Sequence, residues 1–267
     1  MDDEVVDLSY HIRSVNLDHS LVKPEDVVIV DIDDYSIAQL GRSQSWPRSY
    51  DAKVINYIAS GNPKAIAIDY LYTESDSLSE AYIGEMEAAG VTNAREVAGA
   101  MSTDHTLAAA IDSADLVYLA FFDEDAREVM GDFNRASELS LLHCDSDVTR
   151  LERWNRPVLP ISEFSNVAKQ LGGISVKSSS DGTVRYYQAV SALSNGVEAS
   201  KAVANFPVYM MLDAKNIPLS EVVVTKRGLQ YADSLLVPLS DDGSFRLNWL
   251  GNQEKFRYIS YYKVWDE

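Results

Sequence analysis

The sequence predicts an α/β protein in which a mixed β-sheet with a parallel strand–helix–strand core is covered by helices and followed by C-terminal β-hairpins. Two short apolar runs, residues 27–32 and 65–71, flank a segment with helical periodicity. Runs that are almost uninterrupted by polar residues are typical of strands covered on both faces. The last third of the chain alternates short strand-forming segments with glycine-containing turns, which is typical of hairpins.

The first strand–helix–strand unit is the best defined part of this prediction. Between the two apolar runs, the segment 50–58 carries apolar residues at helical spacing, with Ser49 as N-cap and Gly61 as a stop signal. Two strands that are connected by such a helix run parallel, and the connection is a right-handed crossover. We therefore expect residues 27–32 and 65–68 to be parallel, near-central strands of one sheet.

Three aspartates follow these strands. Asp31 and Asp33 end the first strand and Asp69 ends the second, so we expect them at the sheet edge where open α/β sheets usually bind ligands. One interpretation is a carboxylate cluster that binds a ligand or a cation such as Mg²⁺ or Ca²⁺. The other is structural: Asp31 pairs with Arg48 or another cation, and Asp33 or Asp34 caps a short helix over residues 35–40.

The tripeptide Trp46-Pro47-Arg48 precedes the predicted helix. A buried Trp46 and a proline at the helix entry form a packing corner, although Trp46 is also a ligand-binding candidate. We expect the Arg48 guanidinium within salt-bridge distance of Asp31, Asp33 or Asp69, or clamping an anionic ligand. Arg185, which follows the turn at Asp181-Gly182, is a second candidate of this kind; the alternative is an arginine on a solvated strand.

The remaining elements are expected as follows. Residues 74–103, acidic and helix-forming, and residues 123–156, a long polar loop, are predicted insertions in one domain that spans 1–267. Asp104 is expected to cap a helix over 106–111, and Ser162 a helix that ends at Gly172-Gly173. The other expected elements are strands at 116–122 and 174–176, a hairpin from 178 to 190, a helix at 207–215, and hairpins at 222–231 and 235–250.

Composition limits the classes of function. The chain has 267 residues, 46% of them hydrophobic, which allows a sizeable core. Its net charge of −18 argues against binding to nucleic acid or to anionic lipid headgroups. Cys144 is the single cysteine and the four histidines lack paired-ligand spacing, so no intrachain disulfide, no zinc site and no cofactor are expected.

Several short motifs follow one another in a recognisable order. They are Val28-Ile29-Val30-Asp31-Ile32-Asp33-Asp34, Ser36, Gly41, Trp46-Pro47-Arg48, Ala65-Ile66-Ala67-Ile68-Asp69, Asp104, Leu107-Ala108-Ala109-Ala110-Ile111, Leu159-Pro160, Gly173, Asp181-Gly182-Thr183-Val184-Arg185, Val237-Pro238-Leu239 and Asp242-Gly243. This succession resembles the type-two CHASE family, the cyclase/histidine-kinase-associated sensing extracellular domains. The resemblance implies a non-enzymatic, extracytoplasmic sensor domain.

The same resemblance implies how such a domain works. An unidentified small molecule binds, and the rearrangement passes through flanking transmembrane helices to a cytoplasmic output domain, such as a nucleotide cyclase, diguanylate cyclase, histidine kinase or serine/threonine kinase. The family's preceding transmembrane helix and closing strand are not found, so we expect a piece truncated at its C-terminus. The leading segment carries an apolar stripe at Val5, Leu8, Ile12 and Val15, which packs on its own domain or in a homodimer.

Two other classes of function compete with this interpretation. The Asp31/Asp33 pair is superficially similar to the aspartates of the haloacid dehalogenase phosphohydrolases, which would make the chain a metal-dependent phosphohydrolase. That family's pattern has a small hydroxyl residue at the position that Tyr35 occupies here. We therefore expect no phosphatase activity. The third class is a ligand-free scaffold for receptor dimerisation.

Overall fold

The structure, a computed structural model, describes Asp7, residues 26–124, Arg135, Ala136, Leu139, and residues 142–144, 150–176, 178–194, 199–249 and 255–267. The chain divides into two compact units: unit 1 comprises Met1–Trp46 and Leu247–Glu267, and unit 2 comprises Pro47–Arg246. The expected leading helix lies, apart from Asp7, outside the described residues. Among the helices that are described, none is both long and apolar enough to cross a bilayer.

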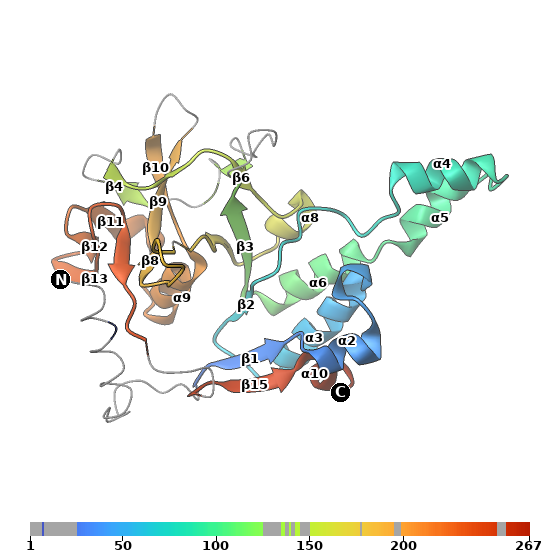
Figure 1. The fold of residues 1–267 in the computed structure, drawn as a ribbon, viewed down its shortest axis with the longest axis horizontal. Coiled ribbons are helices and arrows are strands. Elements are labelled where there is room, and N and C mark those ends of the chain that lie inside the picture. The colour runs from blue at the N-terminus through green and yellow to red at the C-terminus, as the bar shows by residue number, and fades with distance from the viewer. Residues whose placement is uncertain are drawn as a thin grey trace. The chain divides into compact units, whose positions relative to one another are not determined.

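Unit 2 contains the parallel core (Figure 1). Strand β3 (Val117–Asp123) pairs in parallel with β2 (Ile66–Ile68) and β7 (Gln170–Gly173), and antiparallel with β6 (Pro157–Val158). Helix α6 (Asp104–Ala114) lies between β2 and β3 in the sequence, and α8 (Ser162–Ser165) lies between β3 and β7. The predicted mixed sheet with a parallel strand–helix–strand core is therefore confirmed.

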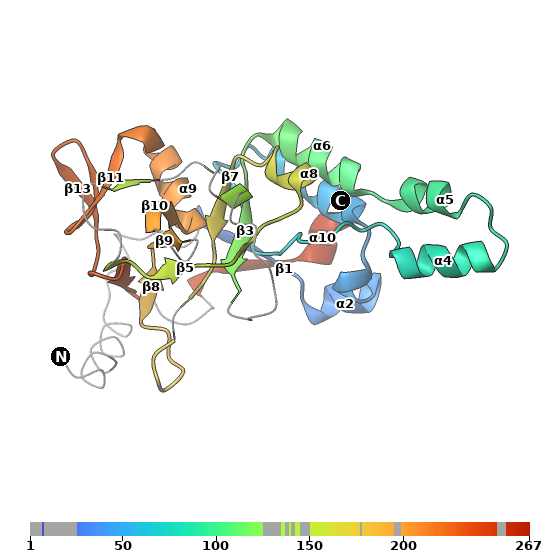
Figure 2. The ribbon, with the colours of Figure 1, turned by 90° about the horizontal axis from the view of Figure 1, so that it is seen from above.

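Helices cover both faces of this sheet (Figure 2). Side chains alternate across a strand, and Leu119 and Phe121 of β3 join one core with α3 (Arg48–Ser60), α6 and α8. Tyr118, on the opposite face, joins a second core with α9 (Phe206–Ala214). The strand β3 is thus buried on both sides, as expected for a strand at the centre of an α/β sheet.

The rest of unit 2 is rich in strands. Strand β9 (Val190–Ser194) lies between antiparallel β10 (Ala199–Ala204) and parallel β5 (Arg153–Trp154). A four-stranded sheet has the order β13 (Ser234–Pro238), β12 (Gly228–Tyr231), β11 (Val222–Thr225) and β4 (His143–Cys144). Strands β8 (Tyr186–Gln188) and β14 (Ser244–Arg246) form an antiparallel pair.

One predicted hairpin is confirmed and another is wrong. Strands β11 and β12 form the expected hairpin, but the turn at Asp242-Gly243 does not join paired strands, because β13 pairs with β12 and β14 pairs with β8. This turn is held by β8 and β9 instead: Gln188 Nε2 donates to the Asp242 carbonyl, and the Val190 amide donates to that of Gly243. Contacts remote in sequence override the local turn signal.

The segment around Gly172-Gly173 also differs from the prediction. It is strand β7, whereas we expected a helix end followed by a strand at 174–176. A Cβ on Gly172 would lie 2.3 Å from the Phe206 Cβ, and one on Gly173 would lie 2.0 Å from the Trp154 ring. These glycines therefore permit β7 to pack closely against the start of α9 and against β5, and they do not stop a helix.

The predicted insertion at 74–103 forms two helices. Helices α4 (Glu80–Ala88) and α5 (Ala94–Met101) lie side by side (Figures 1 and 2) and share a small core of Ile83, Ala94 and Ala98. Ser79 caps α4 by accepting a hydrogen bond from the Tyr82 amide. The helix-forming composition of this segment was therefore a correct guide to its structure.

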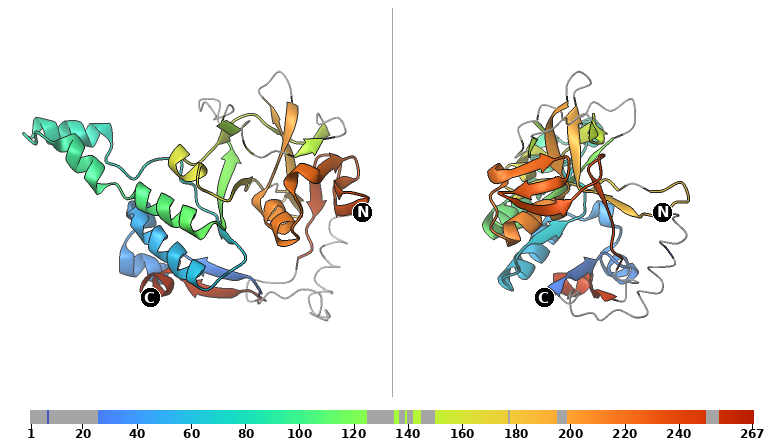
Figure 3. Two further views of the ribbon diagram at one scale, coloured as in Figure 1. Left: turned by 180° about the vertical axis from the view of Figure 1, so that it is seen from behind. Right: turned by 90° about the vertical axis from the view of Figure 1, so that its left-hand side faces the viewer.

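Unit 1 is built from both ends of the chain. Strand β1 (Val28–Asp31) pairs in parallel with β15 (Arg257–Ser260), and the two lie side by side in Figure 3. Unit 1 also contains α2 (Asp34–Leu40), a 3₁₀ turn η3 (Ser43–Ser45) and α10 (Tyr261–Trp265).

The expected pairing of β1 with β2 is wrong. Strand β1 belongs to a two-stranded sheet with β15, whereas β2 pairs with β3. Val28 is 44% exposed, so β1 is not a central strand covered on both faces. The helix between β1 and β2 packs within unit 2, where Ala52 and Ile55 of α3 share a core with Leu107 and Ile111 of α6.

Candidate functional site

The parallel pairing in unit 1 brings together residues from the two ends of the chain. Asp31 and Ser260 are register partners at the carboxyl ends of β1 and β15. Helix α2 begins three residues after Asp31, and α10 begins immediately after Ser260. Ligands bind outside the carboxyl ends of parallel strands in open α/β sheets, and this edge of the pair has the same construction.

A hollow of about 490 Å³ lies at this edge. Its lining, here called the strand-end hollow, consists of Asp31, Asp33, Tyr35, Tyr258, Ile259, Ser260 and Lys263. The hollow is open to solvent, and its volume is comparable to that of small-molecule sites, which is roughly 300–1,000 Å³. The two aspartates that the sequence predicted at a ligand-binding edge therefore do lie together in a hollow, with residues of the C-terminal strand.

The position of Asp33 is fixed by three hydrogen bonds. Its Oδ1 accepts from the Ser36 amide at 2.8 Å, the Ser36 hydroxyl at 2.6 Å and the Ser260 hydroxyl at 2.9 Å. The bonds from Ser36 and then from Ser260 lower the pKa of Asp33, so the carboxylate stays ionised. Asp33 is the N-cap of α2, as one of the two sequence interpretations expected.

Asp31 and Lys263 are held differently. Both line the strand-end hollow, yet within the described part of the chain neither side chain takes part in a hydrogen bond or an ion pair. The hollow thus contains one carboxylate, Asp31, and one ammonium group, Lys263, without a hydrogen-bond or ion-pair partner among the described residues, beside the hydrogen-bonded carboxylate of Asp33. Tyr35 and Tyr258 add aromatic rings that are 49% and 46% exposed.

Sequence reasoning missed the contribution of the C-terminal strand. Residues 257–260 form β15, and helix α10 begins directly after Ser260. The Ser260 side chain makes no capping bond; its hydroxyl donates to Asp33 instead. The apolar alternation around Tyr258 was a signal for a strand, but its partner β1 lies at the opposite end of the chain.

Trp46 forms the packing corner that was expected. Its ring is 8% exposed and stacks on Tyr261 with a centroid distance of 5.0 Å, and its Nε1 donates to the carbonyls of Leu40 and Gly41. It does not line the strand-end hollow. These contacts account for the buried indole without a ligand.

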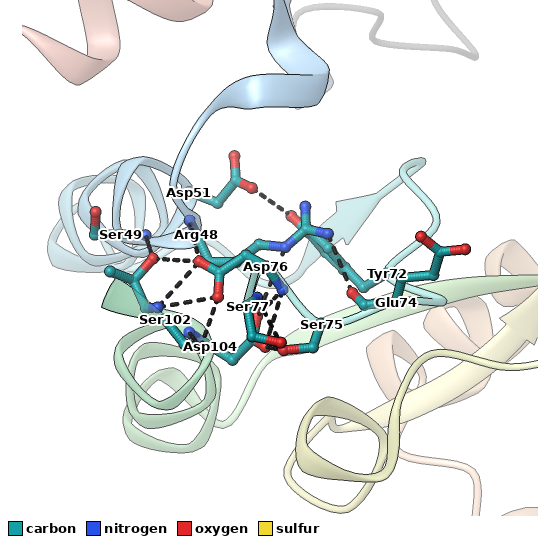
Figure 4. Close-up of polar contacts among 11 residues, drawn as sticks. Arg48, Ser49, Asp51, Tyr72, Glu74, Ser75, Asp76, Ser77, Ser102 and Asp104 are labelled. Atoms are coloured by element: carbon teal, nitrogen blue, oxygen red, sulfur yellow. Dashed lines mark hydrogen bonds and ion pairs between the residues drawn. The ribbon is translucent and has the colours of Figure 1, made fainter. Parts of the chain in front are cut away.

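Arg48 belongs to a polar network in unit 2, most of which Figure 4 shows; it is here called the Arg48 junction and is made of Arg48, Asp76, Ser102, Thr103 and Asp104. The Arg48 Nε lies 3.8 Å from Asp104 Oδ1, and the Arg48 Nη2 donates to the Glu74 carbonyl at 3.4 Å. The guanidinium also stacks over Tyr72, 4.7 Å from the ring centroid. The predicted pairing of Arg48 with Asp31, Asp33 or Asp69 is therefore wrong, and its carboxylate partner is Asp104.

Two aspartates connect the helices in this junction. Asp76 accepts hydrogen bonds from the Arg48 amide, the Ser102 hydroxyl, and the amide and hydroxyl of Thr103. Asp104 is 3% exposed and accepts from the Ser75 hydroxyl and the Asp76 amide. Asp104 does not cap α6 as expected, because Thr103 occupies the N-cap position and Asp104 is the first helical residue.

The pKa of Asp76 shows how strongly the junction favours ionised carboxylates. Burial alone would raise this pKa, but hydrogen bonds from Thr103 and Ser102 outweigh that effect and lower it to about 2. Each of these hydrogen bonds is stronger with the ionised carboxylate than with the protonated one. The ionised form of Asp76 therefore stabilises the folded structure. The Arg48 junction is thus a structural connection between α3, α6 and the segment that leads to α4.

The remaining candidates are separate from the strand-end hollow. Asp69 follows β2 in unit 2 and is exposed. Burial raises the pKa of Tyr187 to about 12, and the nearby charge of Asp69 adds to this shift. Arg185 is buried and donates to both oxygens of Asp181 at 2.9 and 2.7 Å, which holds the pKa of Asp181 well below its usual range. Arg185 is therefore a structural cation, not the solvated arginine of the alternative.

The expected cluster of Asp31, Asp33 and Asp69 does not appear as a metal site. In the described residues, no three carboxylate, imidazole or thiolate side chains are grouped closely enough to hold a metal ion. Cys144, in β4, is half-buried.

Comparison with known proteins assigns the chain to a family. A family model described as the CHASE2 domain matches residues 1–266. Comparison with curated proteins and with solved structures gave no match. Because the family model covers essentially the whole sequence, this chain belongs to the CHASE2 family, whose members are extracellular sensory domains of signalling receptors.

Proposed function

We propose that this chain is the extracytoplasmic, ligand-sensing input domain of a transmembrane signalling receptor, and that its ligand binds in the strand-end hollow. Family membership supports the sensory role. The observation that carries the site is the presence of Asp31 and Lys263 in one hollow with no partner in the described part of the chain. The partners of the domain are flanking transmembrane helices, a cytoplasmic cyclase or kinase output domain, and a second copy of the receptor.

The construction of the hollow suits signal transfer. Its lining comes from β1 and the start of α2 on one side, and from β15 and α10 on the other. A ligand that contacts residues of both sides stabilises the conformation in which β1 with α2 and β15 with α10 can both contact it. Such a ligand shifts the equilibrium between two arrangements by as much as its affinities for them differ.

The chemistry of Asp33 argues against a phosphohydrolase. A general acid must be protonated at the working pH, and catalytic pKa values therefore lie near that pH. The hydrogen bonds from Ser36 and Ser260 lower the pKa of Asp33 and keep it ionised. An aspartate in this state is suited to capping a helix and to attracting a cation, and it is poorly suited to proton donation.

Labelling of cysteines in whole cells tests the proposed location. Cys144 is replaced by serine, and Glu85 on the exposed face of α4 is replaced by cysteine in the full-length receptor. A membrane-impermeant maleimide should label Glu85→Cys in intact cells as fully as in permeabilised cells. Labelling that requires permeabilisation places the domain in the cytoplasm and disproves the proposal.

The output activity of the full-length receptor tests the site. Asp31→Asn removes a charge from the strand-end hollow, and Asp112→Asn removes an exposed charge from α6 as a matched control. We expect the first change to alter the dependence of the output on growth medium extracts and the second to leave it as in the unmodified receptor. Equal responses in both variants exclude the hollow as the sensing site.

A further inference from the structure

The geometry of the strand-end hollow points to a zwitterionic ligand, a small molecule of the amino acid type with an ammonium and a carboxylate group. This inference rests on the proposed function, because it names the ligand class for the same site. Asp31 and Asp33 would hold the ammonium group, and Lys263 would hold the carboxylate.

Unused charges of both signs carry the argument. Asp31 and Lys263 are exposed residues of opposite charge that line the same hollow. Here no ion pair of Asp31 or of Lys263 occurs within the residues that the structure describes. A ligand with one charge of each sign forms charge-assisted hydrogen bonds at both ends, which are the strong ones.

The carboxylate of Asp33, which would bind the ammonium group of the ligand, has a fixed orientation. All three of its hydrogen bonds reach Oδ1, from Ser36 and Ser260, which fixes the orientation of the carboxylate. None of these three bonds involves Oδ2. An ionised carboxylate that is already oriented loses little conformational freedom when it binds a cation, so binding costs less.

The aromatic rings suit the same ligand class. Tyr35 and Tyr258 line the hollow, and half of each side chain is exposed. An aromatic face attracts a cation and also packs against apolar carbon atoms. A bare divalent ion is a poorer fit, because no group of three metal-ligating side chains exists in the described part of the chain. The hollow of about 490 Å³ also has room for a molecule much larger than an ion.

Binding experiments with the full 267-residue chain test the ligand class. Each standard L-amino acid is screened by thermal shift, and every one that raises the melting temperature is followed by calorimetric titration. The amine that lacks its carboxylate and the acid that lacks its ammonium group are then titrated in parallel. We expect at least one amino acid to bind, and both derivatives to bind about ten to a hundred times more weakly.

Two variants test which residue binds the ammonium group of the ligand and which residue binds its carboxylate. Asp31→Asn should weaken the parent amino acid and the amine by about tenfold and leave the acid unchanged, whereas Lys263→Gln should weaken the parent and the acid. The controls are Asp112→Asn and Lys64→Gln, which remove exposed charges that do not line the hollow. The variants keep side-chain size, and their melting temperatures without ligand show that they fold.

Three results would overturn the inference: no amino acid binds, the amine binds as tightly as its parent, or the Lys263→Gln variant binds the parent unchanged. In each case the extracytoplasmic location, tested by Glu85→Cys labelling, and the output response to Asp31→Asn are measured independently. A failure of the ligand class is therefore distinguishable from a failure of the proposed function.

Discussion

The Arg48 junction and the strand-end hollow contain the same kinds of side chain in opposite states. In the junction, Asp76 accepts bonds from four donor groups, and Asp104 is paired with Arg48 and buried. In the hollow, Asp31 and Lys263 have no partner in the described part of the chain. The carboxylates of the junction and Asp31 of the hollow therefore differ in the number of donor groups around them.

This difference teaches how to separate structural charges from charges that are available to a ligand. A buried ion that has lost its partner is costly, so a charge that holds the fold together comes with its partners. A charge that remains in contact with solvent, in a hollow, is stable without them. The comparison predicts that substitutions in the junction lower stability strongly and those in the hollow lower it little. For ligand binding it predicts the opposite: large effects in the hollow and small effects in the junction.

The largest loss of stability is expected for Asp104→Ala. This change leaves the half-buried Arg48 guanidinium without its carboxylate and frees the Ser75 hydroxyl and the Asp76 amide. Breaking a buried pair in this way costs about 3 kcal/mol. Urea unfolding measures it, with Asp112→Ala, an exposed change in the same helix, as the control. A loss no larger than that of the control would remove the distinction between junction and hollow.

A pH titration of stability should reveal Asp76. Its pKa is lowered from 3.8 to about 2, so its ionised form stabilises the folded state above about pH 4, and this contribution disappears as the pH falls to about 2. The shift corresponds to about 1–2 kcal/mol after allowance for partial exposure. Unfolding free energies between these pH values should therefore decline less steeply in Asp76→Asn. Parallel curves would contradict this assignment.

A smaller effect is expected for Ser260→Ala. The change removes one of three hydrogen bonds to Asp33, which keeps both bonds from Ser36, so we expect a loss of about 0.5–1 kcal/mol. Tryptophan fluorescence reports it through Trp46, which stacks on the neighbouring Tyr261. Ser234→Ala, at an exposed position in β13, serves as the control. A loss as large as that of Asp104→Ala would show that the hollow, too, is mainly structural.

The smallest effect on stability is expected for Asp31→Asn. No described hydrogen bond or ion pair is lost, so the free energy of unfolding should stay within about 0.5 kcal/mol of the unmodified chain. A larger destabilisation, measured by urea unfolding, would show that Asp31 has a structural partner. Asp31 would then be a structural charge, like the aspartates of the junction, and not a charge available to a ligand.

The amino-acid sequence predicted what depends on neighbours in the chain. The helix after Pro47, its stop at Gly61, the helix-forming character of residues 74–103, the helix at 206–214 and the hairpin of β11 and β12 follow from local periodicity and turn residues. The presence of Asp31 and Asp33 at a strand end was also correct. Each of these inferences needs only residues that are a few positions apart.

The errors arose where partners are distant in sequence. Strand β1 pairs with β15, and an apolar run of four residues does not encode which strand it will meet. Arg48 was assigned to the nearest strand-end aspartates, whereas its partner Asp104 follows two helices of the segment 74–103. Gly172 and Gly173 suggested a helix end, and only the proximity of Phe206 and Trp154 shows that they belong in a strand.

The pairing of β1 with β15 has a consequence for the order of folding. During synthesis β1 emerges first, but its partner strand is made only after all of Pro47–Arg246. Contacts between near neighbours form quickly, whereas pairings that close a long loop form slowly, so the parallel core of unit 2 should fold before unit 1 closes. A chain that stalls before Tyr258 cannot form the β1/β15 edge at all. The strand-end hollow therefore forms only after the chain has been synthesised through Lys263.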